Sequence, residues 1–420
     1  MRDMRDSGVA WIGEIPSDWS LVRFKDKYVN VKEIAKERSA DFERLALTLN
    51  GVIKRPKDDM DGLQPKEFDG YQILRKNDFV FKMIDLQNVS TSRVGLSPYT
   101  GLVSPAYIRF SPKEQGQYNQ FVYYYLMSMY YNCVYNNLGG NGVRSALNGR
   151  DMGEFVIPYP TESVQRTIST FLDEKCTQVD TLIANVQAQI EKLKAYKQSV
   201  ITEVVTKGLD PAVPMKDSGV EWIGEIPENW STIRVKQLLK ERKERSVDGS
   251  EEPLSMSQKV GLVPTKMLDI IPNMASSFVG AKLTYVEDLV FNKLKAHLGV
   301  FSVSKYDGLV SPDYAVYYST GKVHLKYLEY LFKTPQCISE FRKRSTGIAA
   351  GLTRLYTDGL FAIECPFPNM EEQIAIVDYL NEKCTQIDQL IAIKQAKIEK
   401  LEQYKRSLIY EYVTGKKEVM

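Results

Sequence analysis

The stretch DSGVAWIGEIPSDW at Asp6–Trp19 decides the organisation of this chain, because it returns as DSGVEWIGEIPENW at Asp217–Trp230. Two further pairs follow in the same order. LVSPAY at Leu102–Tyr107 corresponds to LVSPDY at Leu309–Tyr314, and EKCTQVD at Glu174–Asp180 corresponds to EKCTQID at Glu382–Asp388. Trp11 and Trp222 are 211 positions apart, and the later pairs are 207 and 208 apart. The chain is therefore two copies of one unit of roughly 210 residues.

The two copies are not equally alike along their length. The lead segments, Asp6–Trp19 and Asp217–Trp230, match closely, whereas Tyr28–Gly95 and Gln237–Gly299 share little. A common scaffold with divergent middles suggests one task performed on two different targets. The alternative is that the middles are tolerant loops and strands.

Each copy ends in a long predicted helix. Glu162–Lys207 contains neither proline nor glycine. Apolar residues recur at alternating spacings of three and four, which is typical of a coiled-coil seam. The seam positions are Leu172, Val179, Ile183, Val186, Ile190, Leu193 and Val200 in the first copy, and Leu380, Ile387, Ile391, Ile398, Leu401 and Leu408 in the second. Cys176 and Cys384 also occupy the seam, which favours a packing role over a redox role.

One position breaks this pattern, because Lys394 stands where the first copy has Val186. A single amphipathic helix of this length must bury its apolar stripe. We expect the two helices to pair antiparallel and to act as a spacer between two globular domains. A generic dimerisation coiled coil is the alternative.

Proline and glycine mark the domain limits. Pro158 and Pro160 precede the first helix and Gly208 follows it, while Pro366 and Pro368 precede the second and Gly415 follows it. We therefore predict a first globular domain at 1–160, a long helix at 161–208, a second globular domain at 209–368 and a second long helix at 369–420.

The globular portions contain short alternating runs separated by turn residues, which predicts strands. One helix is expected in each, at Gln120–Tyr131 and His324–Lys333, with its tyrosines in the core. The predicted fold class is α+β, in which each domain has a curved, mostly antiparallel sheet with helices, and the two domains are related by an internal pseudo-two-fold repeat.

Basic residues near glycines are candidates for nucleic-acid contact, because glycine lets backbone N–H groups approach phosphates. Two loops fit, Gly139–Gly153 with Arg144 and Arg150, and Arg342–Gly359 with Arg342, Arg344 and Arg354. A solvated structural loop is the alternative. Side chains able to read base edges also occur in the middles: Lys82, Gln87 and Arg93 in the first copy, and Lys293, Lys295 and His297 in the second.

The composition argues against a catalytic centre in the chain. Five cysteines form no C-x-x-C pair, and two histidines cannot supply a histidine-based metal site in each copy. The sequence contains no Walker A motif, no Asn-Pro-Pro-Tyr motif and no glycine-rich loop for S-adenosylmethionine or NAD. We find no apolar run of membrane-spanning length and no signal peptide, so a reducing cytoplasm is expected.

Together, the DSGVxWIGEIPxxW and LVSPxY motifs, the run GIAAGLTRLYTDGL at Gly347–Leu360 and the EKCTQID-led helix resemble the type I restriction–modification specificity (S) subunit, the HsdS family. The likeness covers essentially the whole chain, although Asn141–Phe155 lacks the TRLYTD stretch. The resemblance implies that each globular domain reads one half of a bipartite DNA target, while the paired helices set the gap.

It further implies that the helices dock two methyltransferase subunits, which would methylate adenine with S-adenosylmethionine. Two motor–nuclease subunits would use ATP and Mg²⁺, and this subunit itself would need no cofactor or metal. A fused methyltransferase or nuclease, and an interaction module without nucleic acid, are the competing hypotheses.

Overall fold

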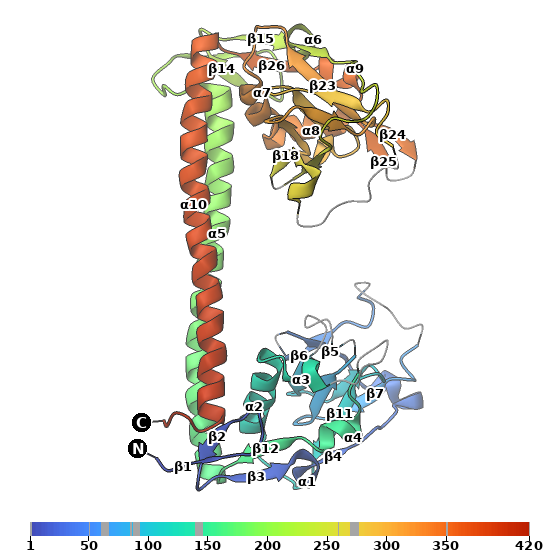
Figure 1. Ribbon diagram of the computed structural model, residues 1–420, viewed down its shortest axis with the longest axis vertical. Coiled ribbons are helices and arrows are strands. Elements are labelled where there is room, and N and C mark those ends of the chain that lie inside the picture. The colour runs from blue at the N-terminus through green and yellow to red at the C-terminus, as the bar shows by residue number, and fades with distance from the viewer. Residues whose placement is uncertain are drawn as a thin grey trace. The chain divides into compact units, whose positions relative to one another are not determined.

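The computed structural model describes residues 2–49, 51–59, 67–84, 86, 93–138, 146–258, 260–268, 277–349 and 352–419. The chain divides into two compact units, of which unit 1 comprises residues 1–187 and 396–420 and unit 2 comprises residues 188–395. Each unit therefore combines one globular domain with a stretch of both long helices (Figure 1).

The long helices are α5 (Glu162–Lys207) and α10 (Met370–Val413). In unit 1, the ring of Phe171 packs at a tilt against that of Tyr412, and the Lys405 ammonium lies 2.7 Å from Asp180. In unit 2, Gln189 accepts from Lys394 at 2.6 Å, and Lys197 lies 2.6 Å from Asp388. As the residue number rises along α5, the number of the contacting residue in α10 falls. The expected antiparallel pairing is therefore confirmed.

The seam residues lie where the two helices meet. Leu172 and Leu380 are fully buried, and the other predicted seam residues are buried or half-buried. Lys394 is half-buried and directs its amine to Gln189, so a polar contact replaces the packing that Val186 makes.

Each long helix ends against a lead segment. Gly208 and Gly415 have φ of +79° and +70°, a left-handed conformation that terminates a helix. A side chain at Gly415 would collide with Pro16 at 2.4 Å and crowd Trp19, and one at Gly208 would crowd Trp230. The end of α5 thus packs on the lead segment of unit 2, and the end of α10 packs on that of unit 1.

Unit 1 contains two four-stranded sheets, ordered β6-β5-β10-β7 and β4-β11-β8-β9, and two-stranded sheets β1-β2 and β12-β3. The strands are β1 (Met4–Asp6), β2 (Glu14–Pro16), β3 (Ser20–Arg23), β4 (Tyr28–Asn30), β5 (Arg44–Thr48), β6 (Gly51–Arg55), β7 (Gln72–Leu74), β8 (Phe79–Lys82), β9 (Arg93–Leu96), β10 (Gly101–Val103), β11 (Ile108–Pro112) and β12 (Val156–Tyr159).

Unit 2 contains the four-stranded sheet β16-β23-β20-β21 and the pairs β13-β14, β15-β26, β17-β18, β19-β22 and β24-β25. Its strands are β13 (Met215–Asp217), β14 (Glu225–Pro227), β15 (Ser231–Arg234), β16 (Leu239–Glu241), β17 (Leu254–Ser257), β18 (Gly261–Pro264), β19 (Lys282–Thr284), β20 (Leu289–Asn292), β21 (Phe301–Val303), β22 (Gly308–Val310), β23 (Tyr314–Ser319), β24 (Thr346–Ala349), β25 (Leu352–Arg354) and β26 (Glu364–Phe367).

The two domains share this topology even where their sequences diverge. The sheet β4-β11-β8-β9 has the same order and directions as β16-β23-β20-β21. The parallel contact Leu102–Arg44 in unit 1 has its counterpart in the parallel bridge Leu309–Pro253 in unit 2. The α+β class with a duplicated, mostly antiparallel domain is confirmed.

The shorter helices cover the sheets of their own unit. They are α1 (Phe24–Lys27), α2 (Gln120–Tyr131), α3 (Val134–Leu138) and α4 (Gly149–Gly153) in unit 1, and α6 (Val235–Leu238), α7 (Leu325–Phe332), α8 (Pro335–Arg344) and α9 (Thr357–Phe361) in unit 2. Three 3-10 turns complete the list: Lys36–Asp41, Thr265–Met267 and Ala296–Leu298.

Helix α8 corrects one expectation, because Arg342 and Arg344 lie in its last turn and not in a loop. Thr334 caps this helix by accepting the Cys337 amide, and Pro335 occupies its first turn. A Thr-Pro pair is a helix-start signal. The basic, glycine-rich stretch after it obscured that signal.

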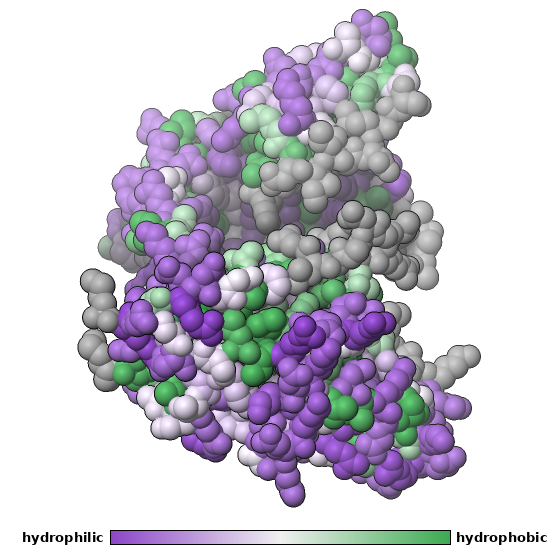
Figure 2. All heavy atoms as spheres, turned by 60° about the horizontal axis from the view of Figure 1, so that its bottom comes forward, coloured by the Kyte–Doolittle hydropathy of each residue, from purple (hydrophilic) through white to green (hydrophobic). Residues whose placement is uncertain are grey.

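Each domain has its own apolar core, which includes Trp19 in unit 1 and Trp230 in unit 2. The core also contains the tyrosines of α2 and α7, since Tyr125 and Tyr327 are almost fully buried. Figure 2 shows a face on which hydrophilic side chains predominate and hydrophobic ones form small groups. Among the described helices, none combines the length and apolarity needed to cross a membrane.

Candidate nucleic-acid interface

The predicted contacts of unit 1 lie in two places. Lys82 ends β8 and faces Arg93 of β9 in the strand register. Arg150 is exposed on α4, whose start is capped by the Asn148 side chain. Gln87 and Arg144 lie outside the described residues.

The predicted contacts of unit 2 separate into two groups. Arg342 and Arg344 are exposed at the end of α8, where Arg344 pairs with Glu340 at 3.5 Å. Lys295 is exposed and His297 half-buried at the 3-10 turn that follows β20. Lys293 lies just before this turn, and its carbonyl accepts the amide of Leu355 at 3.1 Å, which brings Arg354 beside it.

Lys293 and Arg354 belong to a set of five charged residues that we call the charge cluster: Glu241, Lys282, Lys293, Asp313 and Arg354. Arg354 lies 3.1 Å from Asp313, and Lys282 lies 3.4 Å from Glu241. The charge of Lys293 interacts with all four others. Sequence reasoning missed Glu241, Lys282 and Asp313, because they come from three distant strands or strand ends.

The charge cluster is electrostatically unbalanced, with three cations against two carboxylates. Burial lowers the pKa of the Lys293 ammonium, and the nearby charge of Lys282 lowers it further. An anion bound beside Lys293 would favour its charged form. The site can therefore accept a negatively charged or acceptor-rich ligand.

Equivalent contacts attach each domain to its helix. The Tyr124 hydroxyl donates to Asp173 at 2.6 Å, and the Tyr330 hydroxyl donates to Asn381 at 2.8 Å. Asp173 and Asn381 immediately precede the two EKCTQ motifs. Gln165 and Gln373 are buried at equivalent positions and donate to the carbonyls of Pro160 and Pro368. The attachment of domain to helix is thus built the same way twice.

Comparisons with known proteins find similar sequences over most of this chain. Residues 16–194 match the family described as the type I restriction modification DNA specificity domain. The Type I restriction enzyme MjaVIII specificity subunit of Methanocaldococcus jannaschii is 22% identical, over 96% of this chain and 93% of its own length. The putative MjaX specificity subunit of the same organism is 23% identical, over 96% and 95%.

Residues 16–194 thus carry a type I restriction DNA specificity domain, and nearly the whole chain is similar to type I restriction specificity subunits. A chain solved in a study of complex assembly and conformational transition of the type I R-M system shares its fold, with a TM-score of 0.67 and 13% identity over 95% of this chain and 98% of that one.

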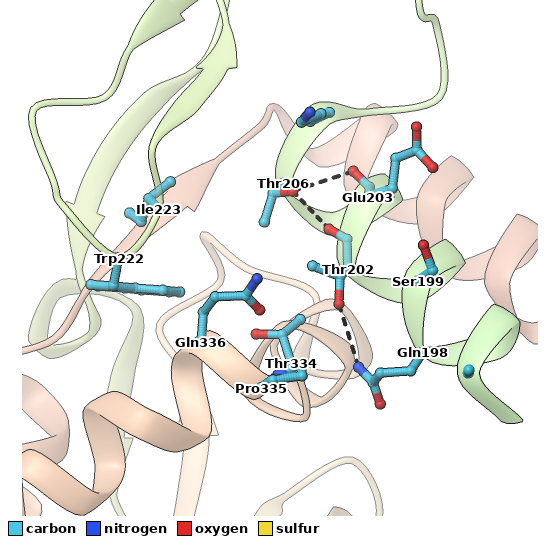
Figure 3. A pocket seen from close by; sticks show the side chains of 12 residues that line it. Gln198, Ser199, Thr202, Glu203, Thr206, Trp222, Ile223, Thr334, Pro335 and Gln336 are labelled. Carbon is cyan, nitrogen blue, oxygen red and sulfur yellow. Dashed lines mark hydrogen bonds between the residues drawn. The ribbon is translucent and has the colours of Figure 1, made fainter.

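The two units differ at the junction of helix and lead segment. In unit 2 a groove of about 660 Å³ opens between α5, Trp222 and Gln336 (Figure 3). Thr202 lines it, whereas the equivalent residue in unit 1 is Tyr410, whose hydroxyl donates to the Ile12 carbonyl at 3.2 Å. At this position unit 1 therefore has the larger side chain, and that side chain contacts its lead segment.

Most of the cysteines are packed in the interior of the protein. All five are free, and four of them are buried. Burial raises the pKa of the Cys176 thiol to about 11, so the nucleophilic thiolate is scarce at neutral pH.

Proposed function

We propose that the chain is a type I restriction specificity subunit that reads a bipartite DNA sequence, one half with each globular domain, while α5 and α10 set the gap between the halves. The observation that supports this proposal is the repetition of one scaffold with different side chains on it. The attachments through Tyr124 and Tyr330 are equivalent, whereas among the described residues the charge cluster occurs only in unit 2. Two domains that share a fold but differ in their surface residues can bind two different DNA half-sites.

The chemistry of the system belongs, in this proposal, to partner subunits. Two methyltransferase subunits would methylate adenine with S-adenosylmethionine. Two motor–nuclease subunits would restrict unmethylated DNA with ATP and Mg²⁺. The specificity subunit selects the DNA sequence for both reactions and binds no cofactor or metal of its own.

Footprinting tests the DNA-reading proposal directly. The chain, assembled with its methyltransferase partner, is incubated with a random DNA pool, and bound fragments are sequenced and footprinted. We expect protection of two short sequences separated by a fixed gap. Recovery of fragments without a shared sequence would contradict the proposal, and methylation by the isolated chain would favour the fused-enzyme hypothesis.

The long helices carry exposed apolar residues at equivalent positions, which supports docking of two copies of one partner. Leu182 and Leu390 are both 48% exposed, and Tyr196 and Tyr404 are 49% and 54% exposed. Each pair is 208 positions apart, the offset of the helix repeat. Because both units present the same residues, we expect one methyltransferase subunit to bind each.

We predict that Leu182→Glu combined with Leu390→Glu abolishes methyltransferase binding, since burying an unpaired carboxylate in an interface is strongly unfavourable. Each single substitution should remove one of the two bound subunits, as measured by native mass spectrometry. Gln178→Glu with Gln386→Glu, at exposed equivalent positions of the same helices, is the matched control. Undiminished binding of two subunits by the leucine double variant would contradict this docking surface.

A further inference from the structure

The charge cluster of unit 2 has an uncharged counterpart in unit 1. Glu241 pairs with Tyr317 across β16–β23, as Asn30 pairs with Phe110 across β4–β11. Lys282 pairs with the valine of LVSPDY, as Gln72 pairs with the valine of LVSPAY. Asn30 and Gln72 therefore occupy the positions of Glu241 and Lys282.

The other three positions follow from the backbone. The Leu355 amide donates to the Lys293 carbonyl at 3.1 Å, and the Leu147 amide donates to the Met83 carbonyl at 3.3 Å. Arg354 and Ala146 immediately precede these leucines, and Asp313 corresponds to Ala106 in the LVSPxY motif. All five charges of unit 2 are thus replaced by neutral residues on the same frame: Asn30, Gln72, Met83, Ala106 and Ala146.

The fold does not require these charges. Unit 1 builds the same strand pairs with neutral residues, and there Gln72 donates to the backbone carbonyls of Ser104 and Tyr107. Partly buried ion pairs add little stability over neutral replacements. Three cations concentrated at one place, in one copy only, point to a ligand of that copy.

The arrangement of Arg354 narrows the chemistry of that ligand. Its side chain is 27% exposed, and one amino group is held by Asp313. The Arg354 Nε–H is buried and has no acceptor within the described part of the chain, so only the terminal amino groups can face a ligand. An arginine fixed in plane matches the O6 and N7 acceptors of guanine, the base contact that arginine makes most often in the major groove. Lys293 beside it has the charge and position to bind a phosphate.

We propose that Arg354, oriented by Asp313, reads a guanine in the half-site recognised by unit 2, while Lys293 binds an adjacent phosphate. This inference rests on the proposed DNA-reading function and assigns a base to one of its two surfaces. In it, Asp313 is a positioning residue, and the neutral residues of unit 1 give the other half-site a different base preference.

Selection from a random DNA pool by the chain assembled with its methyltransferase partner tests the inference. Arg354→Lys retains the charge but removes the planar fork. We expect the preference for guanine at one position of one half-site to fall about tenfold to a hundredfold, with the other half-site unchanged. Asp313→Ala, which introduces the residue found in unit 1, should weaken the same preference by less. Arg234→Lys, at an exposed arginine of β15 that pairs with Glu364, is the matched control and should change no base preference.

A phosphate contact predicts a different result. Lys293→Met, again the unit 1 residue, should weaken binding of all sequences and lower the salt slope by about one. If Arg354→Lys weakened all sequences equally, or left the guanine preference intact, the assignment of Arg354 would be overturned while the bipartite proposal stood. If the unaltered complex selected no sequence in either half, the proposed function itself would fail, and the inference with it.

Discussion

At the scale of single residues, each unit has a buried aspartate at the equivalent position, and the arginine that pairs with it comes from a different place in the chain. Asp78 and Arg109 are each 3% exposed and lie 2.6 Å apart, and Arg109 also donates to the Ile73 carbonyl. Asp288 occupies the equivalent place in unit 2, but its partner Arg242 comes from just after β16 and is 18% exposed.

We predict that Arg109→Ala destabilises unit 1 by about 3–5 kcal/mol, because it leaves the Asp78 carboxylate buried and unpaired. Arg242→Ala should lower the stability of unit 2 by less, since water can reach its site. Urea unfolding, followed by hydrogen exchange in β8 and β20, measures both. Arg150→Ala, at an exposed position, serves as the control with a change within about 0.5 kcal/mol. If Arg109→Ala and Arg242→Ala lowered the free energy of unfolding equally, burial of the ion pair would not explain the difference between the units.

At the scale of elements, the attachment of each domain to its helix uses the same hydroxyl contact with a different acceptor. Tyr124 donates to a carboxylate and Tyr330 donates to an amide oxygen. Hydrogen bonds to charged groups contribute about 1.5–3 kcal/mol and neutral ones about 0.5–1.5 kcal/mol.

Tyr124→Phe should therefore destabilise the packing of α2 on α5 more than Tyr330→Phe destabilises that of α7 on α10. Protection of the amides in α2 and α7 against hydrogen exchange provides the measurement. When Asp173 is first replaced by Asn, Tyr124→Phe should lower the amide protection of α2 only as much as Tyr330→Phe lowers that of α7. A larger effect in unit 2 than in unit 1 would show that the acceptor charge is not what matters.

Helices could be predicted where neighbouring residues in the sequence form a clear pattern. The three-and-four spacing from Leu172 to Val200 defined the first long helix and its seam. The length of the helix predicted a partner, and chain order with the repeat predicted antiparallel pairing. Helix α8 was missed, because its Thr334-Pro335 start precedes a glycine-rich stretch that resembles a loop.

The charge cluster could not be found for a different reason. Its members come from strands that meet only in the folded sheet, and the offset between the copies varies from 207 to 211 positions. With so variable an offset and dissimilar middles, the correspondence of Lys282 with Gln72 emerges only from the strand register.

At the scale of the whole molecule, two separate surfaces on one frame predict modular recognition. Replacing residues 20–157 with those of a relative should change one half-site and leave the other and the gap unchanged. Selected sequences from a random DNA pool give the measurement. Simultaneous change of both halves would show that the domains do not read independently.

The spacer role of α5 and α10 makes a quantitative prediction about the gap. Deleting seven residues from each helix, at 184–190 and 394–400, removes one heptad from both and so preserves the seam period. At 1.5 Å per residue each helix shortens by about 10 Å, which corresponds to roughly three base pairs. We expect both half-sites to be retained with a gap shorter by that amount, or the complex not to assemble. Alanine substitutions at exposed positions of the same heptads control for the change of surface and should leave the gap as it was. A deletion variant with full activity and an unaltered gap would show that the helices do not set the spacing.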